Sequence, residues 1–354
     1  MKSAVVAALV LLVAVMGPVV SSADTVIVDY YGIPPNYSNL QDGIDAVSDG
    51  GTVMVIASIS SGVPVTFRGA GNRGLDFGGK NITLWALTGP NMIAIDCEGA
   101  DRAILLSTGT DSTSHIMGFT FLNGHATDGG GAIKCESGSP RISDCIFRDN
   151  STSGDGGAIA LTQGQTRITD CAFYCNSASG DGGAIHAANS DLGLSACTFS
   201  DNDASDGGGI SLLDCDLTMS LCTLANNEGA PGAGVRLQTT RPGRSAVIER
   251  CILAFGRLGR GVSGGAPEIF HCCVYGNAGG DDLPGNAHDN EFVDPLVCDL
   301  YGVDGGNMSL CSNSPCLQSN NTWALQVGSR AQGCANCDSP VLPSSWGSIK
   351  TLFR

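Results

Sequence analysis

Three acidic residues, Asp155, Asp181 and Asp206, have the type and spacing that could do chemistry. Each stands directly before a run of glycines, and Asp128 stands one place out of step in an earlier copy of the same motif. Carboxylate oxygens are hard ligands that suit Ca²⁺, so a row of them predicts a calcium-binding row. The same pattern fits solvated turns in which an Asp side chain binds nearby backbone. The sequence leaves both interpretations open.

Cysteine is the second reactive residue type, since the chain has 16 of them. One set recurs along the middle of the chain and comprises Cys145, Cys171, Cys197, Cys222, Cys251 and Cys272. Free cysteine is among the most buried residue types, and thiols that project in parallel do not converge for bridging. We therefore expect mostly reduced, buried thiols in this row. Disulfides are expected instead in a C-terminal set, whose pairing the sequence leaves open: Cys298, Cys311, Cys316, Cys334 and Cys337.

Histidine and arginine give weaker signals. The five histidines are scattered, without a second ligand at zinc spacing, and are expected at the surface: His115, His125, His186, His271 and His288. His186 directly follows Ile185, which is expected to face inward, so its side chain should point outward. A set of arginines forms no coherent stripe in the sequence: Arg148, Arg167, Arg236, Arg241 and Arg244.

The even spacing of these residues comes from a repeated motif between His115 and Asn227. It is clearest in a row whose neighbours lie 26, 26, 25 and 25 residues apart: Ile133, Ile159, Ile185, Ile210 and Val235. A fixed period in the twenties is typical of solenoids. Within each repeat, short alternating apolar runs are separated by Gly and Asp, which predicts strands and turns. The sequence therefore predicts a parallel β-helix with two or three strands per coil.

Stacked coils would turn equivalent residues into ladders with a spacing of ~4.8 Å. The inward ladder is expected to contain Cys145, Cys171, Cys197 and Cys222. A second ladder is expected at a turn, where amides can pair from coil to coil, and it comprises Asn150, Asn176, Asn202 and Asn227. The paired glycines would allow a positive φ at a sharp corner.

Outside the regular coils of residues 115–243 the pattern is looser. Residues 25–29 are typical of a first strand, and residues 39–49 of an amphipathic helix that would cover the open end of the first coil. Further early strands are expected over residues 53–56, 63–67, 82–85, 92–95 and 103–106. Two degenerate coils are expected around 248–253 and 269–275, followed by a long loop over 276–290.

In the repeats, a C-x-F-x-x-N-x-A segment precedes GGAI, and NLQDGIDAVSDGGTVMV stands near the start. With these motifs the chain resembles right-handed parallel β-helix proteins of the pectin-lyase-like superfamily, from about Thr25 to Cys337. More narrowly, it is similar to secreted bacterial proteins with polymorphic-outer-membrane-protein-type repeats. The resemblance implies a closing coil over residues 292–337. It leaves function open, because this fold hosts enzymes, adhesins and structural proteins.

Local signatures of the enzymes on this fold are missing from the sequence. The NTD, DD, GHG and RIK set of polygalacturonases is absent as a set, and Asp281 with Asp282 alone is a weak match. The QDTL and DFxFG segments of pectin esterases and the RxPxxR segment of pectate lyases are absent. We therefore assign no catalytic residue from the sequence.

The composition and the two ends of the chain indicate where the protein is located and which partners it can bind. Residues 1–23 read as a secretory signal peptide with cleavage after Ala23, and the apolar run is too short for a membrane span. Without Lys2 the chain carries 17 basic and 34 acidic residues, a net charge of −17, which argues against nucleic acid and anionic membranes. Residues 338–354 read as a Pro/Ser linker and a short tail, either a cap that folds back or a sorting signal.

The prediction is thus an all-β chain, a right-handed parallel β-helix over residues 24–337 with a short N-terminal capping helix. We expect a monomeric, secreted or cell-surface module with a binding, adhesive or structural role, whose partner is a polysaccharide or cell-surface component. No cofactor other than calcium is expected. The alternative is a polysaccharide lyase or glycoside hydrolase, which would need at least two carboxylates and a base on one face within about 10 Å.

Overall fold

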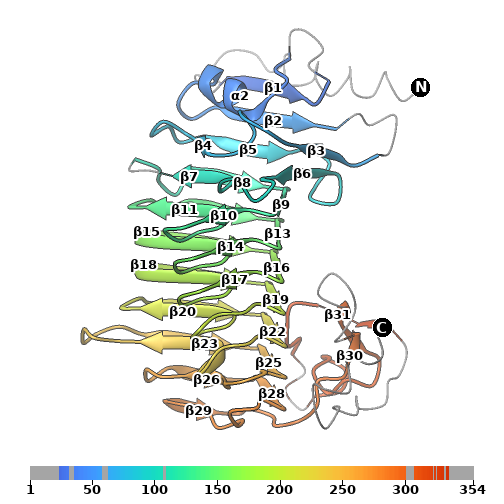
Figure 1. Ribbon diagram of the computed structural model, residues 1–354. Coiled ribbons are helices and arrows are strands. Elements are labelled where there is room, and N and C mark those ends of the chain that lie inside the picture. Colours follow the sequence, from blue (N-terminus) through green and yellow to red (C-terminus); the bar gives the residue numbers. More distant parts are fainter. Residues whose placement is uncertain are drawn as a thin grey trace, which may run out of the picture.

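A computed structural model describes residues 24–31, 36–57, 63–106, 109–299, 307–321, 323, 325–330 and 332–334 of the protein. The expected signal peptide (1–23), the linker and tail (338–354) and Cys337 lie outside the described residues. Within them, strands stack in coils along one axis, from β1 at one end to β29 at the other (Figure 1). The predicted all-β parallel β-helix is confirmed.

Three parallel sheets form the walls of the solenoid. Sheet A contains β1 Thr25–Asp29, β2 Thr52–Ile56, β4 Leu75–Asp76, β5 Thr83–Ala86, β7 Ile104–Leu106, β8 His115–Met117, β11 Ile133–Glu136, β12 Arg141–Ser143, β15 Ile159–Thr169, β18 Ile185–Ser195, β20 Ile210–Leu213, β21 Leu217–Ser220, β23 Gly232–Gln238, β24 Ala246–Glu249, β26 Arg260–Ser263, β27 Glu268–Phe270 and β29 Asn286–His288. Sheet B contains β3 Val65–Phe67, β6 Ile93–Asp96, β9 Thr120–Leu122, β13 Ile146–Arg148, β16 Ala172–Tyr174, β19 Thr198–Ser200, β22 Thr223–Ala225, β25 Ile252–Ala254 and β28 Cys273–Tyr275. Sheet C contains β10 His125–Ala126, β14 Ser151–Thr152 and β17 Ser177–Ala178.

The corners of each coil come from single residues in the left-handed region. In the coil that begins with β12, Asp144 (φ 50°) turns the chain into β13 and Asp149 (φ 56°) turns it into β14. The next coil bends at the equivalent residues, Asp170 (φ 54°) and Cys175 (φ 53°). A glycine-rich corner follows and leads into sheet A, where Gly156 has a φ of 72°. Two-residue and three-residue strands therefore suffice, because tight bends join them.

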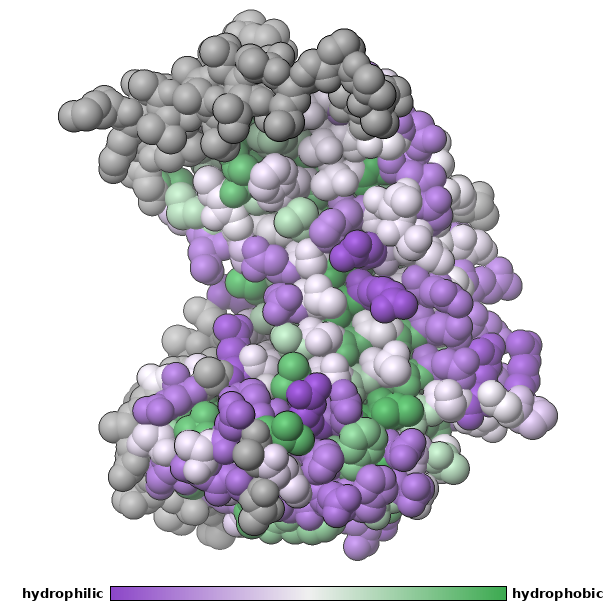
Figure 2. Space-filling view, turned by 180° about the vertical axis from the view of Figure 1, so that it is seen from behind, coloured by the Kyte–Doolittle hydropathy of each residue, from purple (hydrophilic) through white to green (hydrophobic). Residues whose placement is uncertain are grey.

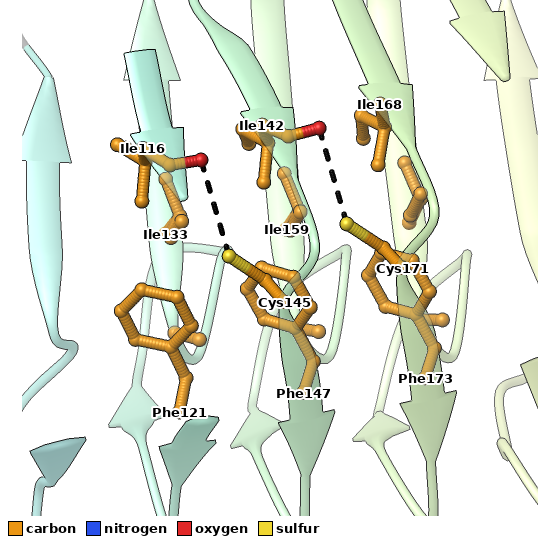
Figure 3. Close-up of a cluster of buried hydrophobic side chains, with 14 of the residues drawn as sticks. Ile116, Phe121, Ile133, Ile142, Cys145, Phe147, Ile159, Ile168, Cys171 and Phe173 are labelled. Atoms are coloured by element: carbon orange, nitrogen blue, oxygen red, sulfur yellow. Dashed lines mark hydrogen bonds between the residues drawn. The ribbon is translucent and has the colours of Figure 1, made fainter. Parts of the chain in front are cut away.

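Stacked apolar side chains fill the interior. Phe121, Phe147, Phe173 and Phe199 lie one above another with ring centroids 5.0, 4.7 and 4.7 Å apart. Cys145 and Cys171 lie beside this stack in the buried core (Figure 3). Free, buried thiols continue along the same row at Cys197, Cys222, Cys251 and Cys272. The core is therefore built from the same side chains repeated at each coil.

An N-terminal helix covers the first coils. Helix α2 (Leu40–Ala46) begins after Asn39, whose Oδ1 accepts a hydrogen bond from the Asp42 amide at 2.8 Å. Leu40 and Ile44 are fully buried. Gly43 lets the helix approach β1, since a Cβ there would lie 2.5 Å from Cγ2 of Val28. Among the described residues no helix has the length and apolar character needed to cross a membrane.

The C-terminal segment differs from the expected closing coil. β30 (Val297–Asp299), β31 (Asn307–Cys311) and β32 (Gln332–Cys334) form a separate sheet, and the β30–β31 pairing is antiparallel. We call residues 294–334 the C-terminal lobe. The lobe lies beside the later strands of sheet B instead of extending the stack (Figure 1). The physical reason is that its apolar residues Leu310, Leu317 and Val327 pack against the outward residues Ile252 and Ala254 of sheet B.

Candidate functional site

Asp155, Asp181 and Asp206 lie at the glycine-rich corner that leads into sheet A, on three successive coils. Asp155 Oδ1 accepts a hydrogen bond from the Asp181 amide at 2.8 Å, and Asp181 pairs in register with Asp206. All three side chains belong to half-buried residues. The row predicted from the sequence therefore exists as a set of neighbouring carboxylates, which we call the acidic corner.

Basic side chains of sheet A project toward the acidic corner. Arg236 Nε lies 2.8 Å from Asp206 Oδ2. His186 Nε2 lies 3.9 Å from Asp155 Oδ2, and only 12% of the His186 side chain is exposed. His186 points out of the solenoid, yet its neighbours cover it, so the expectation of a surface histidine fails at this position. One coil earlier, Asp128 contacts both Arg102 and Lys134.

Burial moves the pKa values of two groups at the acidic corner in opposite directions. Burial, together with the charges of Asp206 and Asp155, raises the pKa of Asp181. Burial lowers the pKa of His186, although Asp155 and Asp181 oppose that effect. The arrangement therefore favours a neutral His186 imidazole, as a general base requires. It also favours an Asp181 carboxyl group that keeps its proton to a higher pH than usual, as a general acid requires.

Some of the carboxylate oxygens that could bind calcium already have partners within the protein. Asp155 Oδ1 accepts from backbone, and Asp206 contacts Arg236. Over the described residues, no three His, Cys, Asp or Glu side chains form a group that could hold a metal ion. The calcium row remains a prediction that a binding experiment must test.

The outer surface of β8, β12, the second half of β15 and β18, and β21 carries two polar rows, and we call it the hydroxyl face. One row, in register on successive strands, consists of Ser143, Thr169, Ser195 and Ser220. All four belong to half-buried residues, and Ser143 Oγ lies 2.7 Å from His115 Nε2.

The second row of the hydroxyl face consists of His115, Arg141 and Arg167, again in register on successive strands. Sequence reasoning considered Arg167 in another set and did not consider Arg141. The signal was present, because both rows follow the repeat step: His115, Arg141 and Arg167 are each 26 residues apart.

The C-terminal lobe covers a different flank of the solenoid. Cys273 of β28 forms a disulfide with Cys316 of the lobe, and both residues are fully buried. Ser329 of the lobe bonds the hydroxyls of Thr198 (2.7 Å) and Thr223 (3.0 Å) on sheet B. The surface seen from behind is hollowed above this lobe (Figure 2). The lobe thus packs on sheet B, away from the register positions that form the hydroxyl face.

The remaining sequence candidates have structural partners. Asp281 accepts hydrogen bonds from the amides of Gly276 and Asn277, both at 3.0 Å, and from Asn277 Nδ2 at 2.8 Å. It therefore organises a loop. His288 stacks on Phe270, with centroids 5.3 Å apart.

Cys316, one of the five C-terminal cysteines expected to form disulfides, is disulfide-bonded. Its partner is Cys273 of β28, which lies outside that predicted set. Cys311 is disulfide-bonded as well. Cys175 is a free, exposed thiol. Partial burial, with Asp201 and Asp149 nearby, raises its pKa to about 11, so little reactive thiolate forms at neutral pH.

Residues 131–295 match the family described as a right handed beta helix region. The match covers the regular coils from β11 onward and both rows of the hydroxyl face beyond β8. It agrees with the fold and with the resemblance to pectin-lyase-like proteins. A search of curated proteins gave no match.

Proposed function

We propose that the protein is a secreted or cell-surface β-helix module that binds a carbohydrate chain along its hydroxyl face. The observation that carries this proposal is the register of Ser143, Thr169, Ser195 and Ser220 on successive coils. Hydroxyls both donate and accept hydrogen bonds. A row of them at ~4.8 Å intervals offers the same contact at every coil, which suits a ligand that is itself a repeating chain.

The shape of the face supports an extended ligand rather than a small molecule. The strands of the face pair in parallel without a break from β8 to β21. A small ligand is usually enclosed in a concave apolar pocket. These strands offer instead the outer surface of a sheet, where most outward residues from β12 to β21 are polar. Linear polymers gain affinity from many weak contacts along such a surface.

A matched pair of variants tests the proposal. Thr169 and Thr162 both lie on β15 and both point outward, but only Thr169 belongs to the hydroxyl row. Thr169→Val keeps the side-chain shape and removes the hydroxyl. We expect Thr169→Val to weaken glycan binding several-fold in a glycan-array or calorimetric assay, whereas Thr162→Val should bind like the wild type. Equal binding by both variants would contradict the proposed face.

A second function, cleavage of a polysaccharide, is favoured by the acidic corner. Two carboxylates and a histidine share one corner there, which meets the condition stated for the enzyme alternative. Carboxylates on adjacent coils are spaced by ~4.8 Å, close to the roughly 5 Å found in retaining glycosidases. In this alternative Asp181 would act as the acid and His186 or Asp155 as the base.

Two assays distinguish cleavage from binding. New reducing ends report hydrolysis, and absorbance from unsaturated ends reports elimination. If either product forms, Asp181→Asn should abolish it and leave binding intact. Glycan binding with neither product supports the binding module alone.

A further inference from the structure

Most arginines in the described part of the chain pair with a carboxylate. In the described part of the chain, every arginine except Arg141, Arg167 and Arg330 lies within 4.0 Å of a carboxylate. Several of these pairs join neighbouring coils, such as Arg236 with Asp206 and Arg257 with Glu228. A chain with a net charge of −16 has ample carboxylates to pair all its arginines. Unpaired arginines therefore stand out.

Two of the three unpaired arginines are direct neighbours. Arg141 and Arg167 are exposed and occupy the same register position on β12 and β15. Like charges directly opposite each other on adjacent strands destabilise a sheet. His115 precedes them in the row and is half-buried. Beyond them the row continues with Gly193 and Thr218, which carry no charge.

Nearby acid does not relieve this repulsion. Asp191 lies on the next strand, β18, but it pairs with Arg244 at 3.1 Å. Among the residues that the structure describes, the guanidinium groups of Arg141 and Arg167 thus have no side-chain partner, and their donors can bind a ligand. A guanidinium binds carboxylate or sulfate through two parallel hydrogen bonds.

We propose that Arg141 and Arg167 form an anion-binding row that takes a chain bearing carboxylate or sulfate groups, with two successive anionic groups about 5 Å apart. This inference rests on the proposed carbohydrate binding by the hydroxyl face and specifies the charge of the glycan. The two arginines hold the anionic groups, and Ser143 and Thr169, two residues further along the same strands, meet the hydroxyls of the chain. His115 sits at the end of the row, with its Nε2 held 2.7 Å from Ser143 Oγ.

The test uses one glucan backbone in three forms: dextran, carboxymethyl dextran and dextran sulfate. Titration calorimetry on the wild-type protein should show binding of at least one charged form and at least tenfold weaker binding of dextran. A comparison of carboxymethyl dextran with dextran sulfate shows whether carboxylate or sulfate is the preferred group. Affinity for the charged form should fall as NaCl is raised, because salt screens exposed charges.

Variants distinguish specific binding by Arg141 and Arg167 from a general effect of positive charge. Arg141→Gln and Arg167→Gln should each weaken binding of the charged dextran about tenfold. Arg330→Gln removes an equally unpaired, exposed arginine from the C-terminal lobe and should change affinity less than twofold. Arg167→Lys keeps the charge but loses the paired donors, so it should lie between the wild type and Arg167→Gln. Thermal melting should show both Gln variants at least as stable as the wild type, because removing one arginine relieves the repulsion.

The outcomes distinguish failure of the anion-binding row from failure of the proposed glycan binding. If wild type binds neutral and charged dextran equally and the Gln variants bind like wild type, the anion row is overturned while glycan binding stands. If no neutral or charged glycan binds, both are overturned. If Arg330→Gln weakens binding as much as Arg167→Gln, the effect is general charge and the row is again overturned.

Discussion

The Oδ1 atom of Asn176 accepts two hydrogen bonds from Asn150, one from its backbone amide at 3.1 Å and one from its Nδ2 at 3.0 Å. Asn176 in turn donates to Asn202 Oδ1 at 2.9 Å and to the Phe147 carbonyl at 3.0 Å. Asn202 repeats the arrangement with Asn227. The polar groups of the buried turn between sheets B and C are thereby hydrogen-bonded from coil to coil. The stability of this turn does not depend on the outward residues, which are free to vary.

Loss of one ladder amide should therefore be costly. Asn176→Ala leaves the buried amide of Asn150 without a partner, which costs about 1–3 kcal/mol. It also removes the side-chain hydrogen bonds of Asn176 with Asn150 Nδ2, Asn202 and the Phe147 carbonyl, each of which contributes about 1 kcal/mol. We expect the free energy of unfolding to fall by about 3 kcal/mol or more, measured by urea denaturation followed by circular dichroism. Asn286→Ala, at an exposed position of β29, should change it by less than about 0.5 kcal/mol. Similar losses for both variants would mean that the ladder is not a main source of stability.

The cysteine row makes a second stability prediction. Cys171→Ser places a hydroxyl in a buried row of apolar side chains, where the nearest acceptor is the Thr169 carbonyl, 3.2 Å from Cys171 Sγ. The expected loss is about 1–3 kcal/mol in a melting or urea experiment. Cys175→Ser is the matched control, because Cys175 lies four residues away and is exposed. A neutral result for Cys171→Ser would contradict the expected cost, because it would mean that the Thr169 carbonyl fully satisfies the buried hydroxyl.

The disulfide should hold the C-terminal lobe on sheet B. Cys273 and Cys316 are separated by 43 residues, and a cross-link that closes a loop of this size contributes about 4 kcal/mol in the chain-entropy account. Cys316→Ala should make the segment between residues 276 and 320 sensitive to limited proteolysis while the coils before it stay resistant. Digestion of the whole chain at one rate would show instead that lobe and solenoid unfold as one unit.

Stability should fall on acidification because of His186. Burial lowers the pKa of His186 in the folded protein, so the unfolded chain binds more protons as the pH falls below the ordinary value of about 6.5. The stabilising contribution is present above pH 6.5 and is lost as the pH falls through the lowered pKa. Melting temperatures between pH 8 and 4.5 should therefore drop more for the wild type than for His186→Gln. Parallel curves for the two proteins would contradict the burial of a neutral imidazole.

The fold could be predicted from the sequence because the repeat step is visible in the chain itself. The spacing from Ile133 to Val235 requires stacked coils, and the structure confirms a parallel β-helix. The C-terminal lobe could not be predicted in the same way, since β30, β31 and β32 follow no period. Its place on sheet B depends on Ile252 and Cys273, whose outward direction becomes clear only when the coil is built.

The acidic corner and the hydroxyl face differ in how far the sequence could define them. Asp155, Asp181 and Asp206 stand before glycine runs and are easy to align. Their partners His186 and Arg236 come from the following strands, so the pKa directions follow from contacts that the sequence does not contain. Arg141 and Arg167 follow the repeat step, but their lack of a carboxylate partner is a fact of three-dimensional packing.

The central claim is best tested by a glycan-array screen of the purified protein, with and without Ca²⁺, in which the same polysaccharides are assayed for cleavage. The account predicts binding of a polysaccharide without cleavage products, with weaker binding by Thr169→Val than by Thr162→Val. The two calcium conditions show whether the acidic corner takes part. Absence of binding to every glycan, or identical binding by the two threonine variants, would contradict it.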